Sequence, residues 1–322
     1  MSKATKIWLI TAASLVTIGV ILFASVMTAY HWDFSRLSTE RCETNTHEIS
    51  EEFSGIKMNT DTADILFAAS SDNTCRVVCY EGENVKHSAS VQDGALTISV
   101  VDDRAWYEHI GFSFHSPTVT IYLPKTEYES LVIEESTGDI TLPKDFTFGR
   151  MDLSVSAGHV DSLASSLGLM RIETSTGDIH LQNLSAGELD LIVSTGHVDV
   201  QSVSCEGNVG ICVSTGDTRL TDISCNSINS NGDTGNITLK NVVTEEIISI
   251  ERSTGDVRFE GCDAGELEIN TDTGNVTGSL LSSKVFIAHS DTGKIDVPET
   301  TSGGKCKITT DTGDIRIEII NE

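Results

Sequence analysis

Hydrophobic and glycine residues recur along most of this chain with a period of 19 or 20 residues. The first full copy contains Ser136-Thr137-Gly138-Asp139-Ile140, and close variants of this motif follow nine more times. A period this regular is the sequence signature of a repeat architecture, in which each copy is one structural unit. The glycines of the ten copies are Gly138, Gly158, Gly177, Gly196, Gly216, Gly235, Gly255, Gly274, Gly293 and Gly313.

Apolar positions within each copy are two residues apart. Counted from the glycine, position −7 is apolar in every copy, and position −5 is apolar in every copy except at Ser230. Position +2 is Ile or Val except at Thr218, and position +4 is mostly apolar. A period of two indicates a strand with one buried face, and glycine provides a turn with positive φ. Each copy is therefore predicted to form two short strands around a turn.

Two strands in about 20 residues cannot bury an apolar face alone, so the copies must stack at the usual strand separation of roughly 4.8 Å. We therefore predict an all-β fold, a parallel β-solenoid of 19–20-residue coils with Thr-Gly turns. Its ten repeats occupy residues 131–322. A row of side-by-side hairpins is the alternative.

The residue after each glycine supports direct stacking. Along the chain this row reads Asp139, His159, Asp178, His197, Asp217, Asn236, Asp256, Asn275, Lys294 and Asp314, so that Asp never follows Asp. Two carboxylates about 4.8 Å apart repel by roughly 1 kcal/mol in water. The alternation avoids this cost, and the histidines are interpreted as part of it.

Residues 7–30 carry no charged side chain and would span about 36 Å as a helix, enough to cross a bilayer. Trp8 lies at one end and Tyr30 and Trp32 at the other, where interfacial aromatic residues are expected. We expect a single-pass anchor in the cell membrane, with residues 1–6 as a cytoplasmic tail and the C-terminal body extracellular. The alternative is a cleaved signal peptide, although its apolar core would be shorter.

Two regions separate the anchor from the repeats. Residues 31–50 are predicted to form a polar stalk, and residues 51–130 a degenerate β region. The repeat pattern occurs once in advance there, at Ile56, Met58, Ile65 and Phe67, with Ala63 in place of glycine. An insertion at residues 104–114 contains four aromatic residues, including Trp106. It is interpreted either as a cap over the open end of the solenoid or as a partner-binding loop.

The last copy continues into an isoleucine-rich segment, and the sequence shows no distinct capping domain after it. We expect this copy to be the exposed edge of the solenoid. Either Glu318 and Glu322 protect the edge by their charge, or another chain covers it.

The chain has 48 acidic and 21 basic residues, a net charge of −27. This balance disfavours nucleic acid and anionic lipid as ligands. It leaves cationic peptides, divalent cations or simple solubility as explanations.

The cysteine positions indicate a chain that does not depend on disulfides. Cys262 and Cys306 occupy apolar rows, where they act as small hydrophobic residues. If Cys75 and Cys79 share one strand, they are about 13 Å apart and cannot bond. Cys205 lies one coil before Cys225, with predicted Cα atoms about 4.8 Å apart, so a bridge between them stays open.

Several kinds of chemistry were considered and none is favoured. The Asp-Thr-Gly triplets at Asp233, Asp272, Asp291 and Asp311 resemble those of aspartic proteases, but they fit repeated turns better. The His159 and His197 imidazoles start roughly 9.6 Å apart, too far for one zinc ion. The nonapeptide of calcium β-rolls is absent. We assign no catalytic, cofactor-binding or metal-binding residue.

The residues also resemble a known family. The resemblance rests on residues 55–65, on Val-Thr-Ile-Tyr-Leu-Pro at 119–124, on residues 131–140 and on the repeated Ser/Asp-Thr-Gly turns. Together these are similar to the putative-adhesin family of bacterial surface β-strand-repeat proteins, a domain of unknown function. The resemblance covers residues 50–322 and implies an exported β-solenoid, sometimes associated with envelope stress and antimicrobial peptides. It implies no catalytic residues.

We therefore expect a non-enzymatic binding or scaffold module at the bacterial cell surface, with cell-wall material, cationic peptides or a membrane protein as partner. The alternative is an envelope-stress sensor or regulator that binds cationic peptides or a membrane partner, and in that case the insertion around Trp106 should be essential. A polysaccharide-acting β-helix enzyme is less favoured, because the repeats contain no Trp or Tyr to stack on sugars.

Overall fold

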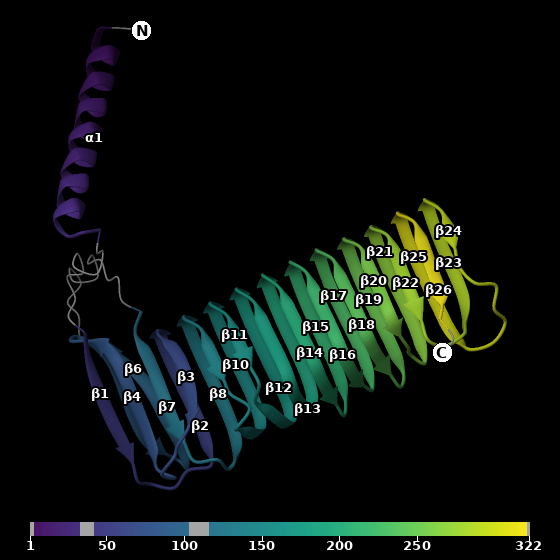
Figure 1. Ribbon diagram of the computed structural model, residues 1–322, viewed down its shortest axis with the longest axis horizontal. Helices are drawn as coiled ribbons and strands as arrows, with labels where there is room; N and C mark the ends of the chain where they lie inside the picture. Colours follow the sequence, from purple (N-terminus) through teal and green to yellow (C-terminus); the bar gives the residue numbers. More distant parts are fainter. Residues whose placement is uncertain (1–2, 33–41, 103–115, 321–322) are drawn as a thin grey trace.

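The computed structural model describes residues 3–32, 42–102 and 116–320 of the chain. One helix, α1 (Lys3–Ala29), precedes a long stack of strands that forms a single sheet of 26 strands (Figure 1). Within α1, Thr5–Ala29 has a mean hydropathy of 2.4 and is long enough to cross a membrane, a property shared by anchors and signal sequences.

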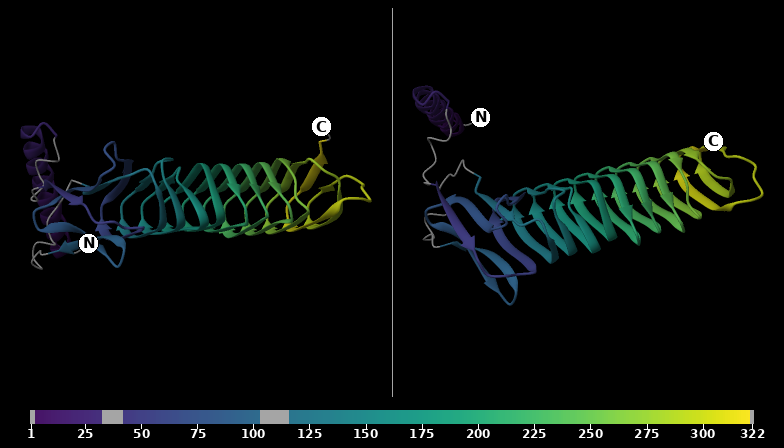
Figure 2. Two further views of the ribbon diagram at one scale, coloured as in Figure 1. Left: turned by 90° about the horizontal axis from the view of Figure 1, so that it is seen from below. Right: turned by 60° about the horizontal axis from the view of Figure 1, so that its bottom comes forward.

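The repeats form the predicted parallel β-solenoid, and the hairpin alternative is wrong. Each coil contributes one strand before its glycine turn and one after it, and each strand pairs in parallel with its counterparts in neighbouring coils (Figure 2). The strands before the turns are β8 (Glu127–Thr137), β10 (Thr147–Ala157), β12 (Ser165–Thr176), β15 (Asn208–Thr215), β17 (Ser227–Thr234), β19 (Ile247–Thr254), β21 (Glu266–Thr273), β23 (Lys284–Thr292) and β25 (Gly304–Thr312). Those after the turns are β9 (Ile140–Leu142), β11 (Val160–Ser162), β14 (Val198–Cys205), β16 (Thr218–Cys225), β18 (Ile237–Thr244), β20 (Val257–Cys262), β22 (Val276–Leu280), β24 (Ile295–Asp296) and β26 (Ile315–Ile319). Strand β13 (Ile179–Thr195) runs from one turn to the next and belongs to both rows.

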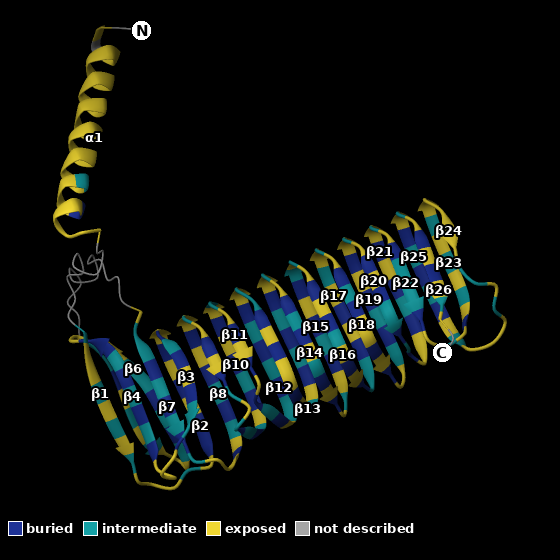
Figure 3. Ribbon diagram, in the orientation of Figure 1, coloured by how far each residue is buried: buried dark blue, intermediate teal, exposed yellow. Residues whose placement is uncertain are grey.

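The apolar rows face the interior between the two rows of strands. Leu131, Ile133 and Ile140 of the first repeat are fully buried, and the equivalent residues form one continuous core along most of the stack. Along most strands, as in β15, buried residues alternate with more exposed ones (Figure 3). The two-residue period of the sequence is therefore the period of burial.

The glycine turns are required by close stacking as well as by φ. Gly158 has φ of 152°, and a Cβ added to it would lie 1.9 Å from the carbonyl oxygen of Gly138 in the coil before. A second bend, six residues later, is held in the left-handed region by Asn183, Asp222 and Asn241, which tolerate it better than most residues.

The N-terminal β region continues the stack. Strands β2 (Gly55–Thr62) and β3 (Asp64–Ala69) form a coil against β8 and β9, as the advance copy of the repeat predicts, and Ala63 stands at the glycine position. Strands β6 (Ala95–Asp102) and β7 (Thr118–Leu123) form the next layer in parallel.

Three antiparallel strands cover this end of the solenoid. Strand β4 (Cys75–Gly82) pairs with β7, β1 (Cys42–Ile49) pairs with β4, and β5 (Val85–Gln92) pairs with β6. The prediction of a polar stalk at residues 31–50 is therefore wrong for Cys42–Ile49, because its polar composition reflects an edge strand. The predicted aromatic insertion at 104–114 lies outside the described residues.

The C-terminal coils do not stack in sequence order. The last coil, with β25 and β26, lies between the coil of β21 and β22 and the coil of β23 and β24. The prediction that the last copy forms the exposed edge is wrong. The outermost coil is the preceding one, where Val285, Ile287 and Ile295 are exposed, whereas Ile315 and Ile317 are buried.

Candidate functional site

The residues that follow the glycines form a continuous hydrogen-bonded ladder along one edge of the solenoid. At each step of the ladder, a side-chain atom accepts a hydrogen bond from the backbone N–H of the equivalent residue in the next coil. Asp139 Oδ1 accepts from His159 N at 2.7 Å, and His159 Nδ1 accepts from Asp178 N at 3.0 Å. The ladder continues through His197, Asp217, Asn236, Asp256, Asn275 and Asp314.

Stacking order explains the one irregularity of this row in the sequence. Lys294 follows Asn275 along the chain, but in the stack it lies beyond Asp314, whose Oδ1 accepts from Lys294 N at 2.8 Å. A lysine side chain has no acceptor and cannot support a further rung. Acid and non-acid residues therefore alternate through all ten copies, and only Asp64, in the degenerate coil, lies next to an Asp, Asp139.

The ladder assigns a structural role to the two histidines that were considered as metal ligands. His159 and His197 each accept through Nδ1 from a backbone N–H, and they lie two coils apart with Asp178 between them. This arrangement matches the interpretation of both histidines as members of the row that follows the glycine turns. A neutral imidazole supplies the acceptor that an Asp or Asn supplies elsewhere.

The candidate binding site is a groove on the outer face of the strands that precede the turns. It crosses β12, β13, β15, β17 and β19 and has a volume of about 570 Å³. Its floor is low because the residues there are small: Gly210, Ser227 and Ser249. Neighbouring coils carry longer side chains at the same rows, so the missing bulk leaves a hollow along the solenoid axis.

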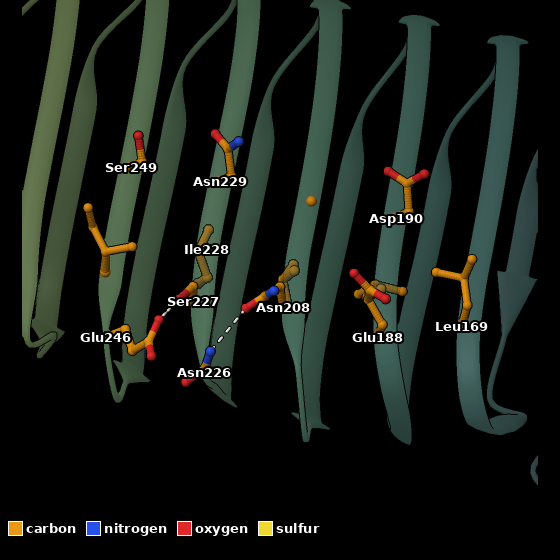
Figure 4. Close-up of a pocket in the computed structure, with 14 residues that line it drawn as sticks. Leu169, Glu188, Asp190, Asn208, Asn226, Ser227, Ile228, Asn229, Glu246 and Ser249 are labelled. Carbon is orange, nitrogen blue, oxygen red and sulfur yellow. Dashed lines mark hydrogen bonds between the residues drawn. The ribbon is translucent and has the colours of Figure 1, made fainter.

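Acidic and amide side chains surround this groove (Figure 4). Glu188 and Asp190 line one end, and Glu246 lines the other, where one of its carboxylate oxygens accepts from Ser227 Oγ at 3.3 Å. Asn226 Nδ2 donates to Asn208 Oδ1 at 3.2 Å between them. Leu169 and Ile247 add apolar surface at the ends, and the lining residues include no Lys or Arg. The groove therefore offers oxygen acceptors and negative charge to a ligand.

One of these carboxylates already has a partner. Arg171 Nη1 lies 2.9 Å from Asp190 Oδ2 and its Nη2 lies 3.1 Å from Glu173 Oε2, so the guanidinium offsets negative charge beside that end of the groove without lining it. All three side chains are about one-third to one-half exposed, so these pairs contribute little to stability. Glu188 and Glu246 are the carboxylates left to attract a cation.

A second hollow near the antiparallel end has the same charge. Its volume is about 790 Å³, and Glu48, Glu51 and Glu52 line it together with Phe53 and Tyr128. The two rings stack with centroids 5.9 Å apart. No Lys or Arg is among its described lining residues. Both hollows are therefore suited to cationic rather than anionic ligands.

Ser230 and Thr218, the exceptions to the apolar rows at positions −5 and +2, have a common explanation inside the solenoid. Arg252 is 1% exposed, and its Nη2 donates to Thr218 Oγ1 at 3.1 Å and to Ser230 Oγ at 3.2 Å. A Cβ on Gly232 would lie 1.6 Å from Nη1 of the same guanidinium. Burial lowers the pKa of Arg252. Both hydroxyl residues were evident as exceptions in the sequence, but the arginine that they bind was not.

The cysteines of the described residues are free thiols in this structure. Cys75 and Cys79 lie on the same strand, β4, and both are free thiols. Cys205 and Cys225 are also free in the structure, and each thiol donates to a backbone carbonyl oxygen. Burial raises the pKa of Cys225 to about 12, which keeps this thiol protonated and unreactive.

Comparison with known proteins places this architecture in a family. The family model described as Toastrack DUF4097 matches residues 53–213 and 208–322. The chain belongs to the Toastrack DUF4097 family. The sequence resemblance to putative adhesins is thereby confirmed, and no curated protein matches this Toastrack chain.

Solved structures share the fold at low identity. A putative adhesin from Parabacteroides merdae is 14% identical, with a TM-score of 0.50 over 87% of this chain and 98% of that one. A putative lipid-binding protein from Parabacteroides distasonis is 13% identical, with a TM-score of 0.50 and the same coverage. At this identity the likeness shows the Toastrack fold and does not transfer a ligand.

Proposed function

We propose that this Toastrack protein is a membrane-anchored, non-enzymatic binding module that displays its solenoid outside the cell and captures cationic peptide segments. The observation that carries the proposal is the groove across β12–β19, which combines three carboxylates, several amides and no lysine or arginine. The net charge of −27 would further attract cations from a distance. Helix α1 is the proposed anchor.

The spacing of the groove carboxylates indicates the form of the peptide. Glu188 and Glu246 lie three coils apart along the stack, which corresponds to roughly 14 Å. An extended peptide advances about 3.4 Å per residue, so its residues i and i+4 are spaced to match and point to the same side. An extended peptide with lysines four residues apart therefore fits the groove best.

Binding to the full-length protein in lipid nanodiscs tests this proposal. A labelled peptide with lysines at i and i+4 should bind the wild type, and the Glu188→Gln/Glu246→Gln variant should bind about tenfold more weakly, because two charge pairs are lost. The matched control is Asp161→Asn/Glu318→Gln, which removes two exposed charges from the other row of strands. Equal weakening by both variants would show an effect of net charge alone and would contradict a role for the groove.

The adhesion alternative makes a different prediction in the same experiment. Purified cell wall that binds the wild type and the groove variant equally, at low and high salt, would favour recognition of wall material by the long faces of the solenoid. Trp106→Ala, in the predicted insertion, should leave peptide capture unchanged if the groove is the site. Loss of peptide capture in Trp106→Ala alone would instead favour the sensor interpretation with the insertion as its binding loop.

A further inference from the structure

A buried cluster of metal-ligating side chains lies at the antiparallel end of the solenoid, away from the groove. Cys79 and Glu81 are alternate residues of β4 and therefore point to the same side of the strand. His87 comes from β5, which follows β4 in the chain. The three residues are 0%, 1% and 3% exposed, and one ligand atom from each lies within 4.8 Å of the other two.

The hydrogen bonds of the cluster fix its carboxylate but leave its histidine incomplete. Glu81 Oε2 accepts from His87 N at 2.6 Å and lies 2.8 Å from His87 Nδ1, and Asn45 Nδ2 donates to Glu81 Oε1 at 2.7 Å. His87 Nε2 is buried without a hydrogen-bond partner among the described residues. His87 Nδ1, 2.8 Å from Glu81 Oε2, is the ring nitrogen placed to share an ion with that carboxylate, because Nε2 lies on the other side of the ring.

We propose that Cys79, Glu81 and His87 form a binding site for a zinc-like divalent cation. Sulfur, imidazole nitrogen and carboxylate oxygen are the three donor types that Zn²⁺ accepts, and three protein ligands leave one position of its tetrahedron for another donor. A thiolate and a carboxylate together neutralise the two positive charges of the ion, while the histidine stays neutral. The thiol proton is released to solvent when the metal binds.

The position of the site gives the metal a structural role. The ligands come from two strands of the antiparallel cap, and the residue that supports Glu81, Asn45, comes from β1, the edge strand. His47 of β1 also has a buried Nε2 without a partner among the described residues, and it is the residue that we test as the fourth ligand. A bound ion would hold β4 and β5 of the cap together, and the Asn45 bond to Glu81 would tie β1 to them.

Cobalt substitution of the full-length protein tests this site. The protein, purified in detergent without a histidine tag and stripped with chelator, is titrated with Co²⁺ and then with Zn²⁺. We expect one equivalent of Co²⁺ to produce a thiolate-to-metal charge-transfer band, which one equivalent of Zn²⁺ removes. Cys79→Ser should abolish the band, and His87→Gln should weaken metal binding by more than about 100-fold, beyond the effect of losing an outer-shell partner.

Two controls keep the result interpretable. Cys262→Ser removes a buried thiol of the solenoid core and should leave the band unchanged. His47→Gln reports whether the fourth position belongs to this histidine, through a change in the visible bands of bound Co²⁺. A folded wild type that gives no charge-transfer band, or a band that persists in Cys79→Ser, would overturn the proposal. In that case Glu81 and His87 form only a buried hydrogen-bonded pair.

Discussion

Arg252 Nη2 donates a hydrogen bond to Ser230 Oγ over 3.2 Å in the interior of the solenoid, where a repeat of this kind would otherwise be apolar. The Nη1 atom of the same guanidinium donates to the carbonyl oxygen of Val213 at 3.3 Å, while Nε has no partner among the described residues. Hydroxyls and a carbonyl thus solvate a buried cation. The buried Arg252 guanidinium needs the hydroxyl of Ser230 as an acceptor. Without Arg252, a serine at this interior position would not stabilise the fold.

A double-mutant cycle should show this dependence. We expect Ser230→Ala to lower the free energy of unfolding by about 1–3 kcal/mol in the wild type, because a buried donor loses its acceptor. In an Arg252→Val background the same change should cost less than about 0.5 kcal/mol. Denaturant unfolding of the four proteins measures the coupling. Equal costs in the two backgrounds would show that the two residues act independently.

Glu135 should make stability depend on pH near neutrality. Burial raises the pKa of its carboxyl from 4.5 to about 7, although the N–H groups of Thr137 and Ala63 partly offset this. The folded state therefore holds a proton that the unfolded state releases. The contribution of this protonated carboxyl to the free energy of unfolding is complete below about pH 4.5 and is lost as the pH rises through 7.

The matched variant isolates this effect. Glu135→Gln keeps an acceptor oxygen but does not ionise, so it should be more stable than the wild type above pH 8, by roughly 3 kcal/mol at most for a shift of this size. The stabilities of the two proteins should become equal near pH 4. Melting temperatures across pH 4–9 provide the comparison. A constant difference over that range would contradict the raised pKa.

The turn-row ladder predicts that acceptor capacity matters more than charge. Asp217 Oδ1 accepts from Asn236 N at 2.8 Å. We expect Asp217→Asn to preserve this hydrogen bond and Asp217→Ala to remove it. The loss should lower the local stability by about 1 kcal/mol, which corresponds to about fivefold faster hydrogen exchange of the Asn236 amide. Faster exchange in Asp217→Asn as well would show that the carboxylate charge, rather than its acceptor, protects the amide.

The order of the C-terminal coils can be tested by cross-linking. Thr312 pairs with Thr273 on one side and with Thr292 on the other. Thr273→Cys/Thr312→Cys should therefore form a disulfide under mild oxidation, since paired Cα atoms lie within bonding range. Thr273→Cys/Thr292→Cys should not, because a whole coil separates these residues. Peptide mass mapping would detect each bridge, and a bridge in the second pair alone would restore sequential stacking.

Much of the fold follows from the sequence because the repeat fixes both the period of burial and the register. Ile56 and Phe67 revealed the advance copy in the same way. The inserted last coil was not predictable from hydrophobicity, since Phe286 and Cys306 suit the same row equally. One signal was available: Lys294 has no acceptor and can only end the ladder. The strand at Cys42–Ile49 was missed because an edge strand alternates weakly.

The candidate sites were less accessible to sequence reasoning. The groove depends on small residues, such as Gly210 and Ser249, that share one row on either side of Asn229 only after the coils stack. The Cys79–Glu81–His87 cluster needs the antiparallel cap, which has no repeat to predict it. The alternation of Cys79 and Glu81 on one strand, followed closely by His87, was the available signal.

The location of bound peptide tests the central claim most directly. A lysine peptide with a photoreactive residue between its two lysines would be cross-linked to the full-length protein in nanodiscs, and the modified residues identified by mass spectrometry. The account predicts cross-links to the groove floor and rim, at Asn208, Asn226 and Ser249, and their loss in Glu188→Gln/Glu246→Gln. Cross-links concentrated on the strands after the turns, such as β14 and β16, or at the hollow near Phe53, would contradict it.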